Sequence, residues 1–529
     1  MADPLGLTDI QVRLFRRFHG LDQVRFDPDR SPAELLRAAV EGLAELRGQE
    51  HRVRYVIHGR AMPVVVPYPH NPLHDVCREL GLGHALAFTV TQQSCASGLL
   101  AVELAGRLLA RDPDDALALV LTGEKAFTRH ARLIPGTSLF GEGASACLVS
   151  ANGPRDRMLS FVCAQRGEFD GEFGDQEEEF QRQYRPSLAE VINRAVADAG
   201  LTLDDIRLVL PHNVNGAAAG GGGAARHPDR RGADAPGRVA DRRRAGHVHR
   251  RPQPALVMRL VRAGRRAFTG NADVLADDDH RAQVTDYFAD LVRPFDAGPV
   301  TDLSGQSYGE MAKALVSDVV PPTEPVDLLV LAFSIHDVWP GRATATYLSH
   351  VCPGTPMSFA VCDQGSASPF TGLRLIGDYG VRRALLVVVE QAALPYESAA
   401  ATPLAHRGVA MLYEGGAGAR ATEVLQYPDV GPDTVAELAR RGVAELSAGH
   451  PGARVALSDS LAAVWPDHPD HTRAPAGQPA TGVWWDLAGA QEDTVLAGDY
   501  DPELRYLCLA RVAADQSSVD WSAASVRRR

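Results

Sequence analysis

The feature that most constrains the fold is a strand–turn–helix pattern that occurs twice. An apolar run at residues 85–90 leads into a turn of small and polar residues at 93–98, and an amphipathic run follows at about 99–109. A second apolar run at 358–361 leads into residues 364–369, which align with 93–98 without a gap. Because an internal repeat signals two copies of one structural unit, the pattern predicts a tandem fold.

Further strand-like runs surround both turns. They lie at residues 53–59 and 116–124 in the first copy, and at 326–333 and 385–390 in the second. We also expect a strand at residues 206–210. Strands that alternate with helical segments are typical of a layered α/β architecture with largely parallel sheets. The sequence therefore predicts the α/β class.

Cys95 lies where a strand turns into a helix. The first N–H groups of a helix have no partner within it and carry partial positive charge, which favours a thiolate, the nucleophilic form of cysteine. Small neighbours leave room for a substrate carbonyl, and their N–H groups would stabilise an oxyanion. The alternative is an ordinary buried cysteine, since free cysteine is among the most buried residue types.

Three motifs follow one another in the first copy. They are Gln93–Gly98 around Cys95, the turn Gly141-Glu142-Gly143-Ala144, and Leu210-Pro211-His212-Asn213-Val214-Asn215. Over about residues 50–215 this series resembles the 3-oxoacyl-ACP synthase III family of the thiolase superfamily. The resemblance implies a thiolase-like layered αβαβα sandwich, usually dimeric, in which Cys95 carries an acyl group and His212 assists its transfer.

Several other residues are candidates for the site. A neutral imidazole at His212 takes and returns a proton near pH 7. Asn215 either holds the loop or is a turn residue. Glu124 ends a predicted strand and has a counterpart in Glu390, so it supports the active site or interface, or has a structural hydrogen-bonding role. Phe140 is pocket wall or core.

The second copy lacks the chemistry of the first. Ser366 stands where the first copy has Cys95, and Asp459 where it has His212. A serine hydroxyl without an adjacent base is a poor nucleophile, and a carboxylate is a weaker base than an imidazole near neutral pH. We expect a degenerate copy that is retained for structure or pairing.

Residues 216–270 break the pattern, with 13 arginines, three aspartates and many glycines, alanines and prolines. A disordered basic linker fits this composition. A nucleic-acid arm fits less well because aromatic residues are scarce. We favour an out-of-frame translation of a GC-rich gene, which would leave the first active site incomplete. The expected organisation is a thiolase-like domain at 1–215, this segment at 216–270, and a degenerate domain at 271–529.

Composition narrows the class of protein. The formal net charge of -12 disfavours a nucleic-acid binder, and seven cysteines without paired spacing argue against a disulfide framework or zinc site. No apolar run is long enough for a membrane span, and the N-terminus lacks the pattern of a signal peptide. We expect a cytoplasmic protein without a metal or other cofactor.

The resemblance to the 3-oxoacyl-ACP synthase III family implies an acyltransferase or decarboxylating condensing enzyme. Acyl-CoA or acyl-ACP would be the substrate and partner, and the protein would be a homodimer or an internal pseudo-dimer. A degenerate second copy favours polyketide or other secondary metabolism, by analogy only. The alternative is a non-catalytic pseudo-enzyme or a scaffold that pairs with an intact ketosynthase.

Overall fold

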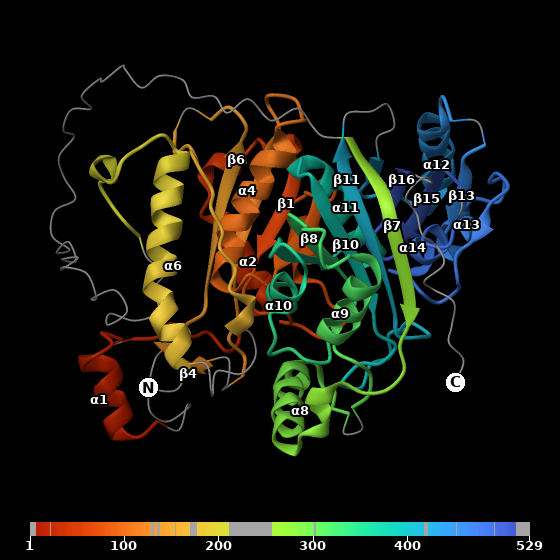
Figure 1. The fold of residues 1–529 in the computed structure, drawn as a ribbon. Helices are drawn as coiled ribbons and strands as arrows, with labels where there is room; N and C mark the ends of the chain where they lie inside the picture. Colours follow the sequence, from red (N-terminus) through yellow and green to blue (C-terminus); the bar gives the residue numbers. More distant parts are fainter. Residues whose placement is uncertain are drawn as a thin grey trace.

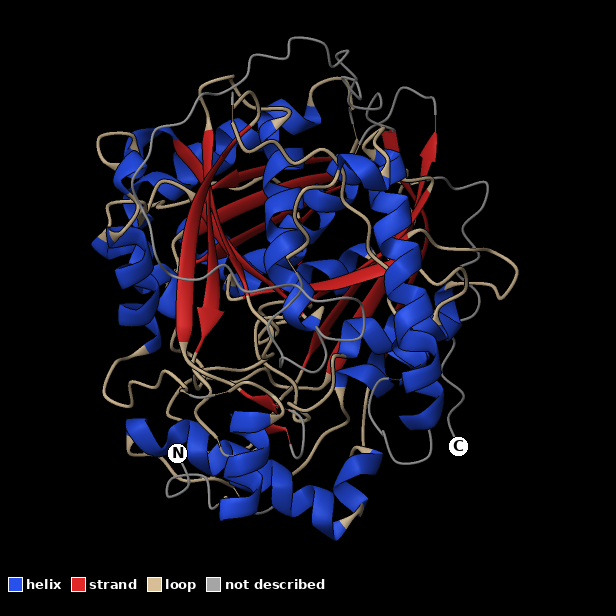
Figure 2. Ribbon diagram, turned by 90° about the vertical axis from the view of Figure 1, so that its left-hand side faces the viewer, coloured by secondary structure: helices blue, strands red, loops and turns tan. Residues whose placement is uncertain are grey.

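The computed structural model describes residues 7–21, 23–128, 132–134, 138–153, 155–169, 177–210, 257–300, 303–416, 422–450, 452–490 and 492–514. We call residues 7–210 the first half and residues 257–514 the second half. The described residues form a nine-stranded sheet, a five-stranded sheet and a two-stranded sheet, with helices on both faces of the long sheet (Figures 1 and 2). The α/β class is therefore confirmed.

Both halves contribute strands to the nine-stranded sheet, whose order is β6-β3-β1-β2-β9-β8-β10-β11-β7. The expected apolar runs around both turns form its interior strands. The nine strands of this sheet, of which β6 and β7 are the edges, are β1 (Val53–Gly59), β2 (Leu86–Thr91), β3 (Leu117–Glu124), β6 (Gly143–Ser150), β7 (Val257–Ala267), β8 (Leu328–Ala332), β9 (Met357–Cys362), β10 (Arg383–Glu390) and β11 (Arg407–Gly416).

The two halves meet where β2 pairs antiparallel with β9, with Thr89 opposite Cys362 and Thr91 opposite Ala360. From this junction outward, the first half runs β2-β1-β3-β6 and the second half runs β9-β8-β10-β11. In both series the fourth strand is antiparallel to the third. Each of these four strands of the first half therefore has a counterpart at the mirrored position of the second.

The second half contains its strand pattern twice. In the long sheet the strands of the second half lie in the order β9-β8-β10-β11-β7, and in the five-stranded sheet the order is β14-β13-β15-β16-β12. If each set is numbered from one along the chain, both orders are three, two, four, five, one. Those strands are β12 (Glu423–Tyr427), β13 (Arg454–Leu457), β14 (Thr472–Arg473), β15 (Thr494–Asp501) and β16 (Tyr506–Ala513). Among the described residues, the first half has no counterpart of β7 and none of the five-stranded sheet; its other sheet is the two-stranded pair of β4 (Leu133–Ile134) and β5 (Ser138–Leu139).

Helices complete the layers. In the second half α9 and α10 cover one face of the long sheet, α11 and α14 lie between the two sheets, and α12 and α13 cover the outer face of the five-stranded sheet. This order is αβαβα, as predicted. The helices of these layers are α9 (Tyr308–Val319), α10 (Thr344–Val351), α11 (Ser368–Tyr379), α12 (Pro432–Ser447), α13 (Asp459–Val464) and α14 (Gly482–Leu487).

In the first half, α2 and α3 pack on one face of the sheet and α4 on the other, where it touches α11. The remaining described helices are α1 and α6 in this half and α8 in the second. Their bounds are α1 (Asp9–Arg17), α2 (Pro32–Glu41), α3 (Pro72–Glu79), α4 (Ser97–Leu109), α6 (Glu177–Asp198) and α8 (Asp278–Val292). None of the helices in the described residues is both long and apolar enough to cross a membrane.

The strand expected at residues 206–210 does not form. Leu208, Val209 and Leu210 are 71%, 62% and 82% exposed, and no strand of the described residues pairs with them. An apolar, extended segment becomes a strand only when a neighbouring strand accepts its hydrogen bonds. In the first half that neighbour is absent from the described residues, so this prediction was wrong.

The strand β7 lies inside the segment 216–270. It pairs with β11 along its whole length, from Val257 opposite Gly416 to Ala267 opposite Arg407. Its arginines carry the basic character of the segment to the surface, where Arg262 binds Glu324 at 2.7 Å and Arg266 binds Asp318 at 3.2 Å. We had expected the anomalous segment to extend across these residues, so its C-terminal boundary was wrong.

Candidate active site

The turn that carries Cys95 has an unusual backbone. Gln92 and Ser94 adopt positive φ angles of 69° and 47°, in the left-handed region that non-glycine residues rarely occupy. Residues Ser94–Ala96 form a single 3-10 turn that leads into α4, and all three are exposed. A non-glycine backbone in this region persists only when its surroundings hold it, and such strain is common at functional sites.

The second half holds this turn in place. The Thr346 hydroxyl donates to the Gln92 carbonyl at 2.8 Å, and the Ala345 N–H donates to Gln92 Oε1 at 2.7 Å. Gln93 Nε2 donates to the Ser358 carbonyl at 2.9 Å. The two residues at the N-terminal side of the Cys95 turn are therefore fixed by α10 and β9, across the junction of the two halves.

The electrostatic environment of Cys95 differs from the expectation. Desolvation, followed by the nearby Glu124 carboxylate, raises the pKa of the Cys95 thiol, and the residue's own backbone N–H only partly opposes them. We expected the start of α4 to favour the thiolate. Cys95 instead precedes α4 by two residues, so partial desolvation of its thiol and the nearby Glu124 carboxylate outweigh the helix.

Glu124 is the last residue of β3 and is half-buried. Its Oε2 accepts hydrogen bonds from the N–H groups of Ala61 at 2.8 Å and Met62 at 3.3 Å. Burial raises the pKa of this carboxyl, and Arg60 opposes the shift. Glu124 thus holds the loop after β1 and also influences the Cys95 thiol.

The other residues predicted for this site in the first half are His212, Asn215 and Phe140. His212 and Asn215 lie outside the described residues. Phe140 is 40% exposed, and its N–H donates to the Arg132 carbonyl at 2.9 Å. Of the predicted site residues in the first half, only Cys95 and Glu124 are shown to influence each other.

The turn of the second half repeats this backbone with different side chains. Asp363 and Gly365 have φ angles of 59° and 53°, at the positions of Gln92 and Ser94. Ser366 is 5% exposed, and its N–H donates to Asp501 Oδ2 at 3.2 Å. Gly365 is required because a Cβ there would lie 2.0 Å from that same oxygen.

Sequence reasoning missed the carboxylates beside Ser366. Asp459, the expected counterpart of His212, lies 3.8 Å from Arg473 in an ion pair. Asp499 and Asp501 approach Ser366 instead, and burial raises the pKa of Asp499 to about 6 although the Ser366 side chain lowers it. The sequence signal that could have identified them is a pair of aspartates, with one residue between them, in an otherwise apolar strand.

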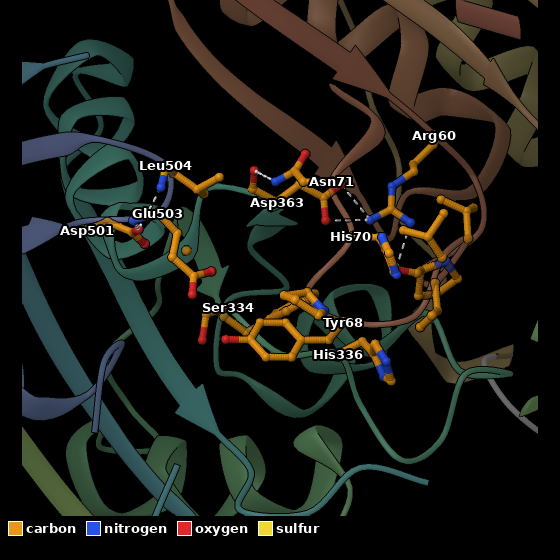
Figure 3. A pocket seen from close by; sticks show the side chains of 17 residues that line it. Arg60, Tyr68, His70, Asn71, Ser334, His336, Asp363, Asp501, Glu503 and Leu504 are labelled. Atoms are coloured by element: carbon orange, nitrogen blue, oxygen red, sulfur yellow. Dashed lines mark hydrogen bonds and ion pairs between the residues drawn. The ribbon is translucent and has the colours of Figure 1, made fainter. Parts of the chain in front are cut away.

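A cavity of about 80 Å³ adjoins the second turn, and Figure 3 shows that residues of both halves surround it. Arg60, from the loop after β1, is 4% exposed and donates to both carboxylate oxygens of Asp363, at 2.9 and 3.1 Å. Asn71 Nδ2 donates to the Asp363 carbonyl at 2.7 Å. Each half therefore braces the turn of the other.

No family model matches the chain, but part of it is similar in sequence to two curated proteins. The β-ketoacyl-[acyl-carrier-protein] synthase III of Nitratidesulfovibrio vulgaris is 27% identical over 162 residues, covering 26% of this chain and 48% of that protein. The synthase III of Rhizorhabdus wittichii is 32% identical over 157 residues, covering 26% and 47%. The chain spans about half the length of these curated relatives.

Two solved structures also match about half of this chain. The 3-oxoacyl-(acyl carrier protein) synthase III of Pseudomonas aeruginosa PAO1 is 13% identical, with a TM-score of 0.34, covering 49% of this chain and 99% of that chain. A tetronic acid condensing enzyme is 16% identical with the same TM-score, covering 48% and 100%.

Fold and site together define a tandem α/β protein with an exposed thiol at a strand–helix junction. Both curated relatives are β-ketoacyl-[acyl-carrier-protein] synthases III. The resemblance to 3-oxoacyl-ACP synthase III, inferred from the motifs around Cys95, is confirmed.

Proposed function

We propose that the first half is an acyltransferase or condensing module that works through an acyl-Cys95 thioester. The observation that carries this proposal is the exposed Cys95 on a turn with two left-handed, non-glycine residues, whose N-terminal side is held by the hydrogen bonds between Gln92, Gln93 and the second half. Its resemblance to the ketoacyl synthases III supports the same chemistry. The substrate is a thioester of CoA or of an acyl carrier protein, and no bound cofactor takes part.

The first step is thioester exchange. Cys95 loses its proton, and its sulfur attacks the thioester carbonyl to form a new carbon–sulfur bond. The bond from that carbonyl carbon to the substrate sulfur breaks, and the departing thiolate takes up a proton. Since a thiolate is both nucleophile and leaving group, the exchange is nearly balanced. His212 is the proposed base, because an imidazole accepts a proton near neutral pH.

The acyl group then leaves Cys95 in a second step. In a condensation the acceptor is the carbanion formed when a malonyl thioester loses carbon dioxide, and in a simple transfer it is another nucleophile. We propose a cytoplasmic role in polyketide or other secondary metabolism. The pairing of β2 with β9 would take the place of the dimer contact implied by the resemblance.

The test is intact-protein mass spectrometry of the full chain after incubation with acyl-CoA and acyl-ACP thioesters. We expect a single acyl adduct that is absent from Cys95→Ala and retained in Cys147→Ala, which removes another exposed thiol. No adduct with any thioester, from a preparation whose Cys95 still reacts with iodoacetamide, would contradict the proposal. That outcome would favour a non-catalytic scaffold, an alternative supported by the raised pKa of the Cys95 thiol.

A further inference from the structure

The two turns lie on equivalent faces of the long sheet, but only one face is covered by a five-stranded sheet in the described residues. In the second half, the five-stranded sheet and α14 lie over α11 and the Ser366 turn. In the first half, among the described residues, no five-stranded sheet lies over the corresponding surface around α4 and Cys95; the segment 159–165 reaches it instead, with Phe161 packed on the core beside α4 and Cys163 Sγ 3.8 Å from Gln93 Oε1. We call this surface, made by Ser94, Cys95, Ala96 and Leu99, the open face.

Matched residues of α4 and α11 measure the difference. Leu99 follows Cys95 by four residues and is 62% exposed. Phe370 follows Ser366 by four residues, is fully buried, and packs on Trp484 of α14 with 4.7 Å between ring centroids. A large apolar side chain at the same position is thus solvated in one half and buried in the other.

Glu124 and Glu390 form a second matched pair. Glu390 accepts hydrogen bonds through both carboxylate oxygens from the segment before α14, at 2.8 Å from the Ala480 N–H and 2.7 Å from the Thr481 hydroxyl. Glu124 accepts through Oε2 alone in the hydrogen bonds of the described residues. Glu390 therefore binds the segment before α14 through both carboxylate oxygens, whereas Oε1 of Glu124 accepts no hydrogen bond among those of the described residues.

The helix α6 of the first half has the same place in the chain order as α12 of the second half, but among the described residues it has no five-stranded sheet to cover. In the second half, α12 buries Val435, Ala439 and Leu446 against the five-stranded sheet, and β13 follows it. In the first half, α6 precedes the exposed residues 206–210 and no side chain described in it is buried. It lies at the same end of the long sheet as β6, away from α12 (Figure 1).

The chain between the halves is a poor source of the missing cover. After β13, the second half uses residues 458–513 to form α13, β14, α14, β15 and β16. The stretch 211–256 is shorter than that, and it is rich in glycine, alanine, arginine and proline. Its composition lacks the alternating apolar residues that a half-buried sheet requires.

We propose that the open face is a docking surface for a separate polypeptide that supplies a five-stranded unit of the β12–β16 type. Its occupant places an aromatic or large aliphatic side chain on Leu99, as Trp484 lies on Phe370. It also directs backbone N–H groups to Glu124, as Ala480 does to Glu390. This assignment concerns a surface and does not depend on acylation of Cys95.

The first experiment measures how open Cys95 is in the full chain. A thiol reagent, 5,5′-dithiobis(2-nitrobenzoic acid), is followed by peptide mapping, with the buried Cys77, Cys352, Cys362 and Cys508 as internal controls for folding. We expect Cys95 to react at least tenfold faster than these four at every protein concentration. Slow reaction of dilute protein would mean that the chain covers its own face. Protection that grows with concentration would mean that a second copy covers it. Either result overturns the proposal.

The second experiment supplies the proposed cover within one chain. Residues 211–256 are replaced by a duplicate of residues 423–513, which contains all of β12–β16, so that the open face meets a unit of the required fold. We expect Cys95 labelling to slow at least tenfold, and Leu99→Asp in the same chain to restore it. Unchanged labelling while the four buried cysteines stay protected would overturn the proposal.

Hydrogen–deuterium exchange on the unaltered chain provides a test that needs no chimera. The amides of α6 should exchange at least tenfold faster than those of α12, since only α12 packs on a sheet. Equal protection of the two helices would overturn the proposal, whether or not the chimera folds.

Discussion

The Cys95 and Ser366 turns have nearly the same backbone and very different surroundings. Both place a left-handed residue before and after a buried glutamine, and both lead through one 3-10 turn into a helix. Cys95 is exposed, whereas Ser366 is buried beside two aspartates. The shape of the turn is thus maintained by the junction of the halves, while the chemistry available at it depends on what covers the helix.

Matched truncations on the two helices should give the largest contrast. Phe370→Ala removes a fully buried ring that packs on Trp484 and should lower the free energy of unfolding by about 3–5 kcal/mol. Leu99→Ala removes a mostly exposed side chain and should change it by less than about 0.5 kcal/mol. Urea unfolding followed by circular dichroism measures both. Equal losses would mean that the two faces are covered alike.

The two glutamates should differ in their effect on pH dependence. Burial raises the pKa of Glu390 to about 7, so this group stabilises the folded state below its unfolded pKa. That contribution is lost as pH rises from about 5 through 7, and a shift of this size corresponds to roughly 3 kcal/mol. Relative to Glu390→Gln, the wild type should therefore lose stability over this range.

Urea midpoints of both proteins at pH 5, 6, 7 and 8 measure this difference. Glu124→Gln is the matched control, and its curve should follow the wild type more closely because Glu124 is only half-buried. Parallel curves for wild type and Glu390→Gln would show that Glu390 does not hold its proton in the folded state.

Much of the fold was predictable from local patterns. Apolar runs before each small-residue turn predicted β2 and β9, and the gap-free match of the two turns predicted the tandem arrangement. These signals are local because a strand and the helix that follows it are encoded by adjacent residues. The glutamate that ends each third strand was also visible in the sequence as a matched pair.

The rest depended on contacts distant in sequence. Residues 206–210 have the composition of a strand, but nothing in that composition reports whether a partner strand exists. The bonds from Thr346 to Gln92 and from Arg60 to Asp363 join residues about half a chain apart, so no spacing rule identifies them. The raised pKa of the Cys95 thiol likewise reflects Glu124, which only the fold brings near.

Thr346 tests whether the second half is needed for the chemistry of the first. Thr346→Val removes the hydroxyl that donates to the Gln92 carbonyl, a hydrogen bond of about 0.5–1.5 kcal/mol. We expect the rate of Cys95 acylation or alkylation to fall by roughly two- to tenfold with little change in melting temperature. Thr346→Ser keeps the hydroxyl and should restore the rate. Equal rates for all three proteins would remove Thr346 as a positioning residue.

The smallest effect concerns the charge that Glu124 places near Cys95. Its carboxylate raises the pKa of the Cys95 thiol, so Glu124→Gln should lower that pKa and increase the thiolate fraction near neutral pH. The rate of reaction with iodoacetamide at pH 7.5 should rise by less than about fivefold, because a partly exposed charge pair contributes about 0.2–1 kcal/mol. The full pH–rate profile should shift to lower pH, whereas Glu390→Gln, in the other half, should leave it unchanged. A profile that does not move, or that moves to higher pH, would mean that Glu124 acts on Cys95 only through the loop that it holds.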